Sequence, residues 1–186
     1  MTKRLPRSFY TKSTLITSKK LLGKYIVRKI ARKKLVGKII ETEAYIGPQD
    51  KASHAYGGKI TPRNKAEYLI GGHIYIYLVY GMYWQLNAST SYQGKPECVL
   101  IRALDLGKTT DGPGKVCRYL QLDKSFYGED LTKSKRIWLE DRGERVRPNQ
   151  ITATSRVGID YAGPYWSRRK WRFILTSKSP FPPLRK

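Results

Sequence analysis

Two glutamates in a short apolar run are the residues whose types and spacing could most directly do chemistry. Glu41 and Glu43 stand two positions apart in Ile-Ile-Glu-Thr-Glu-Ala-Tyr, and on a strand this spacing points both side chains to one face. A carboxylate among apolar neighbours is costly to bury unless it has a partner or a catalytic role. An ionised carboxylate could activate a water molecule and stabilise positive charge that develops on a substrate. The alternative is that both glutamates face solvent and balance nearby lysines.

A group of tyrosines follows around a tight turn. Tyr75 and Tyr77 share one face of a predicted strand, and Tyr80 precedes Gly81, where the chain is expected to reverse. Packing is the simplest role for the strand tyrosines, because aromatic residues favour strands. A tyrosine at the tip of a hairpin is difficult to place in a core. In a basic protein, an exposed tip aromatic can wedge between base steps and its aromatic neighbours can stack on a base.

The composition favours an anionic partner. The chain has 186 residues, with 37 Lys and Arg against 14 Asp and Glu and a formal net charge of +23. This imbalance opposes compactness by self-repulsion, and nucleic acid is the leading partner, ahead of a membrane surface or solubility alone. A hydrophobic content of 40% is enough for a core, so the length predicts one folded domain.

The remaining residue types predict neither a metal centre nor a cofactor. Cys98 and Cys117 are expected to be buried free thiols, because the histidines lie far from them without ligand spacing. His73 is expected to be structural, and the glycines before Lys115 lack the spacing of a nucleotide-binding loop. The sequence shows neither a signal-peptide-like run nor 18 consecutive apolar residues, so we expect an intracellular monomer without membrane contact.

A mixed α/β (α+β) fold, with a mostly antiparallel sheet flanked by helices, is expected to position these residues. Alternation and turn residues predict strands at 25–30, 35–45, 73–79, 83–89, 98–104, 137–140, 151–155 and 171–176. A short helix capped by Thr17 or Ser18 is expected to run to Leu22, and another is expected over 113–120. A third is expected to begin at Thr61, with a proline at its first helical position, and to end by residue 71. Residues 1–12 are predicted to be a loose basic lead-in, and the prolines at 180–183 to end the fold.

Spaced motifs from about Leu21 to Phe181 resemble the alkyladenine (3-methyladenine, or methylpurine) DNA glycosylase family. In order, they are Glu41-Thr-Glu-Ala-Tyr45, Gly47-Pro48, His54, Gly57-Gly58, Thr61-Pro-Arg-Asn64, Tyr77, Tyr80-Gly-Met-Tyr83, Asn87, Arg102-Ala103 and Gly112-Pro-Gly-Lys115. The resemblance implies a single glycosylase domain over residues 1–186, with a curved sheet and a β-hairpin that inserts into DNA. It also implies base-excision repair of duplex DNA carrying damaged purines, namely the class of 3-methyladenine, 7-methylguanine, hypoxanthine and ethenoadenine. The base would be flipped out and its N-glycosidic bond hydrolysed, leaving an abasic site.

The same resemblance implies roles for individual residues. Glu43 matches the general base that activates water. Tyr45, His54 and Tyr77 match the residues that line the pocket and stack on the flipped base. Tyr80 matches the wedge that enters the duplex. Asn87 matches a residue that excludes bases with an extra amino group, and Arg102 one that holds the flipped nucleotide near its phosphate. Supporting roles fall to Arg63 and Asn64.

Other interpretations of the same residues stay open. The matched pocket positions hold no lysine, which favours a monofunctional hydrolase over a Schiff-base mechanism. A non-enzymatic nucleic-acid-binding protein would use the tyrosines as a stacking platform. A glycoside hydrolase would use Glu41 and Glu43 as a carboxylate pair, about 7 Å apart at the backbone. Basic residues outside the motifs would either grip phosphates or form a solvated face: Arg142, Arg145, Arg147 and 168–170.

Overall fold

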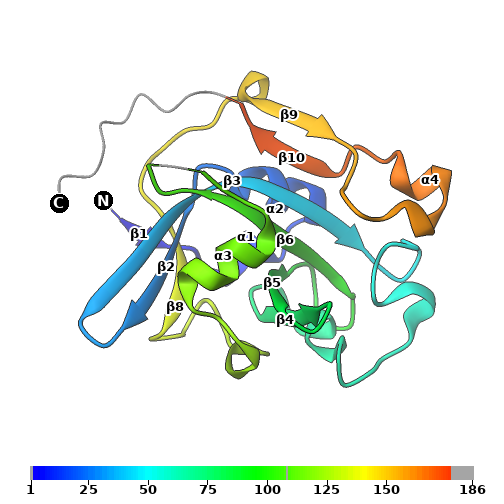
Figure 1. Cartoon of the computed structure of the whole chain (residues 1–186), viewed down its shortest axis with the longest axis horizontal. Helices are drawn as coiled ribbons and strands as arrows, with labels where there is room; N and C mark the ends of the chain where they lie inside the picture. Colours follow the sequence, from blue (N-terminus) through cyan, green and yellow to red (C-terminus); the bar gives the residue numbers. More distant parts are fainter. Residues whose placement is uncertain (1, 108, 177–186) are drawn as a thin grey trace.

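An antiparallel sheet organises the chain in the computed structural model, which describes residues 2–107 and 109–176 (Figure 1). The strands follow the order β1-β8-β2-β3-β6-β5-β4, with β7 beside β6 and the pair β9–β10 beside β3. Every strand pairing in the described residues is antiparallel, as predicted. The strands are β1 (Lys3–Arg4), β2 (Tyr25–Ile30), β3 (Lys33–Ile46), β4 (Ile74–Val79), β5 (Tyr83–Ser89), β6 (Glu97–Asp105), β7 (Thr109–Asp111), β8 (Ile137–Asp141), β9 (Ile151–Thr154) and β10 (Arg172–Leu175).

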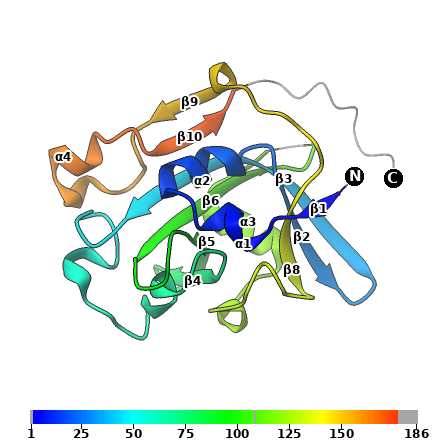
Figure 2. The same cartoon turned by 180° about the vertical axis from the view of Figure 1, so that it is seen from behind.

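Short helices cover the two faces of the sheet. Helix α3 lies on one face, and α1 and α2 lie on the other (Figures 1 and 2). Apolar side chains from α2, such as Leu21, and from α3, such as Leu120, belong to one buried cluster with the sheet. The mixed α/β prediction is therefore confirmed. The α-helices are α1 (Arg7–Tyr10), α2 (Thr14–Leu21), α3 (Pro113–Leu120) and α4 (Pro164–Ser167), and the 3₁₀ helices are Tyr56–Gly58, Lys65–Tyr68, Lys124–Phe126, Pro148–Gln150 and Asp160–Ala162.

Strand β3 is the long central element, and it is irregular where the glutamates lie. It pairs with β2, β6 and β10, and its register with β6 shifts between Ile39 and Glu41 and again between Glu41 and Thr42. Such bulges bend a strand, increase its twist and are common beside active sites. Gly37 permits the close approach of β6, because a Cβ there would lie 2.8 Å from a methyl carbon of Leu104. The curvature of the sheet thus arises beside the two carboxylates.

The prediction of a loose lead-in over residues 1–12 is wrong. Strand β1 pairs with β8, and Tyr10 is completely buried in the core beside Leu5. The guanidinium of Arg7 donates to Asp130 at 2.5 Å. The basic composition of the segment concealed its apolar residues, which are spaced so that they pack against the sheet.

Two helix predictions also need correction. Instead of a helix from Thr61, the chain makes turns followed by the 3₁₀ helix Lys65–Tyr68. The Asn64 side chain accepts hydrogen bonds from the backbone N–H and the hydroxyl of Thr61, and this local bonding competes with an α-helix. Helix α2 begins at Thr14 with Ser13 at the N-cap position, so Thr17 and Ser18 lie inside the helix and do not cap it. The Ser18 hydroxyl lies 2.9 Å from that of Thr42 in β3.

The other sequence predictions agree with the structure to within a few residues. Strand β2 has the predicted bounds, α3 begins at Pro113 after Gly112, and both cysteines are buried free thiols. His73 is structural, since its Nδ1 lies 2.7 Å from the Ile70 carbonyl oxygen. The prolines at 180–183 lie outside the described residues. Within the described residues, no helix has the length and apolar character needed to cross a membrane.

Candidate active site

A cavity of about 500 Å³ brings together most of the residues predicted to act on a base. Its wall comes from β3, the loop after it, β4, β5 and β6, and includes Tyr45, His54, Arg63, Tyr77, Tyr80, Asn87 and Arg102. The two other predicted residues, Glu43 and Asn64, are buried directly behind residues of this wall. Glu43 bonds to Tyr45, and Asn64 bonds to the carbonyl of His54. Positions spread over 60 residues of the chain therefore form one site.

The Glu43 carboxylate is completely buried and held by two hydrogen bonds. The backbone N–H of Val157 donates to Oε1 at 2.9 Å, and the Tyr45 hydroxyl donates to Oε2 at 2.8 Å. A guanidinium nitrogen of Arg102 lies 3.4 Å from Oε1. Burial raises the pKa of Glu43, although the Arg102 charge and the two hydrogen bonds act in the opposite direction. The carboxylate is fixed in place with a raised pKa, which suits a group that takes up a proton.

Glu41 has a different environment. The Nε atoms of Arg102 and of Arg172 on β10 donate to the same oxygen, Glu41 Oε1, at 2.8 and 2.7 Å. The Glu41 side chain is 13% exposed, so neither glutamate is a solvent-facing residue that merely balances lysines. Because Glu41 is occupied by two guanidinium groups, the pair does not resemble two free carboxylates of a glycoside hydrolase.

The predicted aromatic wall is a fixed assembly. The His54 ring packs edge-on against Tyr77, with ring centroids 4.6 Å apart and an interplanar angle of 78°. The Tyr75 hydroxyl lies 2.6 Å from His54 Nδ1, and the Tyr77 hydroxyl donates to Gln85 Oε1 at 3.1 Å. Burial and the nearby charge of Arg63 lower the pKa of His54 to about 4, so the imidazole is neutral at physiological pH.

Tyr80 occupies the tip of the β4–β5 hairpin and is 88% exposed. The backbone φ is 51° at Tyr80 and 70° at Gly81, two successive left-handed residues that are typical of a type I′ turn. A positive φ is unfavourable for a bulky residue, and such strain concentrates at functional sites. Met82 is also largely exposed beside it. The hairpin therefore presents apolar side chains to solvent at the rim of the cavity.

Besides Arg102, three polar residues predicted around the pocket have distinct environments. Asn87 is buried, and its Nδ2 donates to the backbone carbonyls of Tyr75 and Gln85 at 3.2 and 3.3 Å, while its Oδ1 has one long contact, with the Cys98 thiol at 3.7 Å. The Arg63 guanidinium lies over the Tyr77 ring, 5.3 Å from its centroid. Asn64 is buried and ties the loop from His54 to Thr61 through its side-chain hydrogen bonds. Asn64 thus supports the wall without lining it.

Sequence analysis missed a buried ion pair beneath the site. The Arg156 guanidinium donates to both oxygens of Asp50, at 2.5 and 2.9 Å, and both side chains are completely buried. Arg156 also lies over the Tyr45 ring at 4.7 Å and precedes Val157, which bonds to Glu43. Among 37 cationic residues, the sequence gives no reason to single out this one. Gln85 and a buried glutamate, Glu67, were likewise not predicted to belong to the site, and Tyr75, which was expected either to pack or to stack on a base, also lines the cavity.

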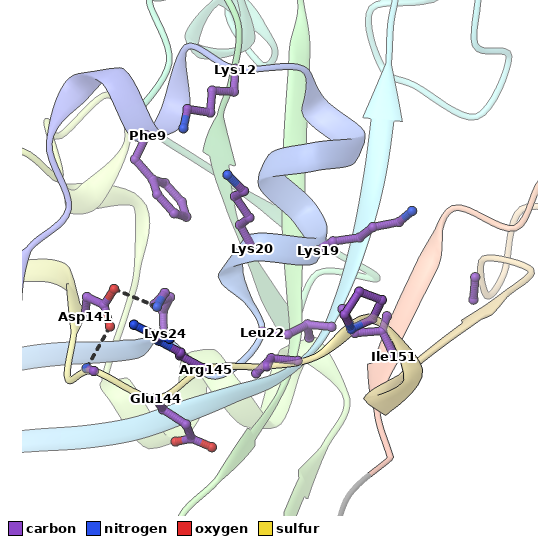
Figure 3. Close-up of a pocket in the computed structure, with 14 residues that line it drawn as sticks. Phe9, Lys12, Lys19, Lys20, Leu22, Lys24, Asp141, Glu144, Arg145 and Ile151 are labelled. Carbon is purple, nitrogen blue, oxygen red and sulfur yellow. Dashed lines mark hydrogen bonds and ion pairs between the residues drawn. The ribbon is translucent and has the colours of Figure 1, made fainter.

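A second cavity, of about 820 Å³, lies elsewhere and contains none of the predicted site residues. Figure 3 shows Lys12, Lys20 and Phe9 on one side of it, and Asp141 and Arg145 on the other. Lys24 forms an ion pair with Asp141 at 2.7 Å. This cavity gathers Arg145, one of the basic residues predicted to grip phosphates, and its second carboxylate, Glu144, forms an ion pair with Lys38 at 3.2 Å.

Comparisons with known proteins agree with the geometry. The family model described as methylpurine-DNA glycosylase matches residues 8–179. A Desulfitobacterium hafniense protein with the name "Putative 3-methyladenine DNA glycosylase" is 42% identical, covering 93% of this chain and 95% of the relative. A Clostridioides difficile protein with the same name is 40% identical, covering 92% of this chain and 100% of the relative. The mouse protein named DNA-3-methyladenine glycosylase is 38% identical, covering 92% of this chain and 59% of its own length. The chain belongs to the methylpurine-DNA glycosylase family.

Proposed function

We propose that this protein removes alkylated or deaminated purines from duplex DNA by hydrolysing the N-glycosidic bond with a water molecule activated by Glu43. Its family makes it a DNA glycosylase, with 3-methyladenine as the base named for its relatives. The wider class of 7-methylguanine, hypoxanthine and ethenoadenine is part of the proposal. The observation that carries it is the buried Glu43 carboxylate directly behind an aromatic cavity whose rim bears an exposed tyrosine.

Tyr80 is proposed to capture the extrahelical state of the damaged nucleotide. A base inside a duplex is inaccessible to attack at its glycosidic bond, so the nucleotide must leave the stack at a cost of about a few kcal/mol. The exposed Tyr80 ring can fill the vacated space and offset part of that cost by stacking. Damaged bases are paired less stably, so discrimination begins before the base reaches the cavity.

The cavity supplies a binding place for the flipped base. Tyr45, His54 and Tyr77 present ring surface, and stacking contributes about 1–3 kcal/mol per base. Many alkylated purines carry positive charge, which is favourable over electron-rich rings. The neutral state of His54 avoids repulsion with such a base. Asn87 and Arg102 are proposed to select against an extra amino group and to hold the nucleotide phosphate, respectively.

Glu43 is proposed to take a proton from water as the oxygen of that water attacks the anomeric carbon. The glycosidic bond breaks, and the purine leaves with the electron pair of that bond. The negative charge of the carboxylate also stabilises the positively charged sugar in the transition state. Val157 and Tyr45 fix both carboxylate oxygens, so Glu43 does not have to be reoriented during the reaction.

The proposed product is an abasic site with an uncut strand. No lysine lines the cavity in residues 2–107 and 109–176, and this supports direct hydrolysis over a Schiff-base intermediate. The proposed partner is damaged duplex DNA, bound by a monomeric intracellular enzyme. The net charge of +23 supports an affinity for DNA that falls steeply with salt.

The decisive experiment incubates the protein with duplexes that contain one hypoxanthine or one ethenoadenine, followed by alkaline cleavage at abasic sites. Strand breaks that appear only after alkali support a monofunctional glycosylase. Glu43→Gln should abolish excision and retain binding to lesion DNA, whereas the matched Glu41→Gln should be far milder. Retained turnover by Glu43→Gln would remove this residue from the role of base. Binding to both duplexes without excision of either base would favour the non-enzymatic alternative.

A further inference from the structure

One carboxyl group of the base cavity has no role in the mechanism above. Glu67 belongs to the 3₁₀ helix Lys65–Tyr68 and lines the cavity, yet it is only 2% exposed. A carboxyl in such a place is unfavourable unless a cation or several hydrogen bonds compensate for its desolvation. The contacts of Glu67 show how far its desolvation is compensated.

The compensation is incomplete. Glu67 Oε1 has one long contact, with the Cys98 thiol at 3.9 Å, and the Tyr75 hydroxyl is near enough to the carboxyl to affect its pKa. The other oxygen, Oε2, has no hydrogen-bond partner, and no lysine or arginine forms an ion pair with Glu67 in the part of the chain that the structure describes. Burial raises the pKa of Glu67 to about 8, against smaller opposing effects of the Tyr75 hydroxyl and the Cys98 thiol and with some help from the charge of Asp50. Near neutral pH the group is therefore a carboxylic acid with an unused O–H donor.

The fold itself gives no reason for an acid at this position. An apolar side chain of similar volume would fill the same space without an unpaired polar atom, and such replacements are often neutral or stabilising. An unsatisfied buried group in a binding cavity instead indicates a ligand that completes its hydrogen bonding.

Neighbouring polar groups show what Glu67 adds to its own part of the cavity wall. Asn87 offers only its Oδ1 acceptor, because its Nδ2 is bonded to backbone carbonyls. The Tyr77 hydroxyl is bonded to Gln85, and the Tyr75 hydroxyl lies against His54. The Cys98 thiol contacts both Glu67 and Asn87, at 3.9 and 3.7 Å, so these two side chains lie on the same part of the wall. A protonated Glu67 adds a donor next to the Asn87 acceptor.

We propose that Glu67 is a specificity-determining residue that, as a neutral carboxylic acid, donates a hydrogen bond to a ring nitrogen or exocyclic oxygen of the flipped purine. The inference rests on the proposed function, because it needs a purine in the cavity. It predicts a preference for lesions with a free acceptor on the edge that meets Glu67. Ethenoadenine is the sharpest probe, because its pyridine-type ring nitrogens are acceptors and the base has no N–H donor.

The test compares equilibrium binding to two duplexes that differ only at the lesion: one contains ethenoadenine and the other a tetrahydrofuran abasic-site analogue. The abasic duplex keeps the contacts to the hairpin and phosphates but places no base in the cavity. Binding is measured in the Glu43→Gln background, with Glu67→Leu and the matched Glu67→Gln, which keeps a donor. Loss of one hydrogen bond in a buried site reduces affinity about tenfold. We expect Glu67→Leu to lower the ethenoadenine-over-abasic preference about tenfold, and Glu67→Gln to keep most of it.

A second arm varies pH. With Glu67 present, the preference for ethenoadenine should decline above about pH 8 as the donor proton is lost. With Glu67→Gln it should stay level. A merely structural role would weaken binding to both duplexes equally and leave the preference unchanged, and that result would overturn the inference.

The same measurements separate this inference from the proposed function. Normal excision by the native protein together with an unchanged preference in Glu67→Leu overturns the role of Glu67 alone. If the native protein excises no base but its preference for ethenoadenine depends on Glu67, the cavity binds the base and the hydrolytic mechanism is refuted. Both variants are first checked for a single cooperative unfolding transition on heating.

Discussion

Replacing Glu67 by glutamine should change how the stability of the free protein depends on pH. The ordinary pKa of a glutamate is 4.5, and burial raises that of Glu67 to about 8. Between these values, the unfolded chain has released the Glu67 proton and the folded protein still holds it. The folded state then binds more protons than the unfolded state, so the free energy of unfolding falls as pH rises through this range and levels off above it.

The magnitude follows from the size of the shift. Each pKa unit corresponds to about 1.4 kcal/mol, so this one carboxyl should cost about 3 to 4 kcal/mol of stability between pH 5 and pH 8. Glutamine resembles the protonated form and does not titrate, so Glu67→Gln should remove this cost. For a chain of this length, 1 kcal/mol shifts Tm by about 2–4 °C. We expect the Tm difference between Glu67→Gln and the native protein to grow by about 10 °C from pH 5 to pH 8.

Differential scanning calorimetry at pH 5, 6.5 and 8 and constant ionic strength measures this difference. Carboxylates with lowered pKa values, such as Asp130 beside Arg7, stabilise the fold as the pH rises. They are present in both proteins, so their contributions cancel in the Tm difference. Asp123→Asn is the matched control, because Asp123 is exposed and the Ser125 hydrogen bonds lower its pKa. A Tm difference for Glu67→Gln that stays level from pH 5 to pH 8 would refute the reasoning and show that Glu67 ionises like a solvated carboxyl.

Three further predictions concern the site. Because burial raises the pKa of Glu43, single-turnover excision should increase with pH as Glu43 ionises; a rate that is already constant from pH 4 upward would contradict its role as base. Tyr80→Ser should weaken capture of lesion DNA more than binding to undamaged DNA and leave Tm nearly unchanged, because the side chain is 88% exposed; a large drop in Tm would instead assign it a packing role. Arg156→Ala should destabilise the protein by about 3–5 kcal/mol in urea unfolding, because it leaves Asp50 buried and unpaired, and a loss below 1 kcal/mol would show that water replaces the guanidinium.

The parts of the fold that sequence predicts well are those governed by local pattern. The alternation in Tyr25–Ile30 gives β2 its bounds, and the Tyr80–Gly81 pair marks a hairpin because few sequences tolerate two left-handed residues. The lead-in and the segment from Thr61 were predicted wrongly, because their conformation depends on packing with distant strands or on a single side-chain hydrogen bond.

The same distinction holds for the site. Spaced motifs brought Glu43, Tyr77 and Asn87 to attention, and the structure places them at one cavity. The environments of Glu67 and Arg156 could not be predicted, because burial and the identity of the partner are set by tertiary contacts across many residues. Neither residue stands in a distinctive local pattern.

The hydrogen bond from Val157 to Glu43 joins positions 114 residues apart. Val157 follows β9, which is far from β3 in the sequence. The ion pair between Arg156 and Asp50 fixes this segment beside the end of β3. A chain that is cut or unfolded near residue 156 therefore loses one of the two hydrogen bonds that fix the Glu43 carboxylate, together with the part of the cavity wall formed by Val157 and Tyr161. On the proposed mechanism, a break at this point should therefore inactivate the enzyme and not merely alter its choice of base.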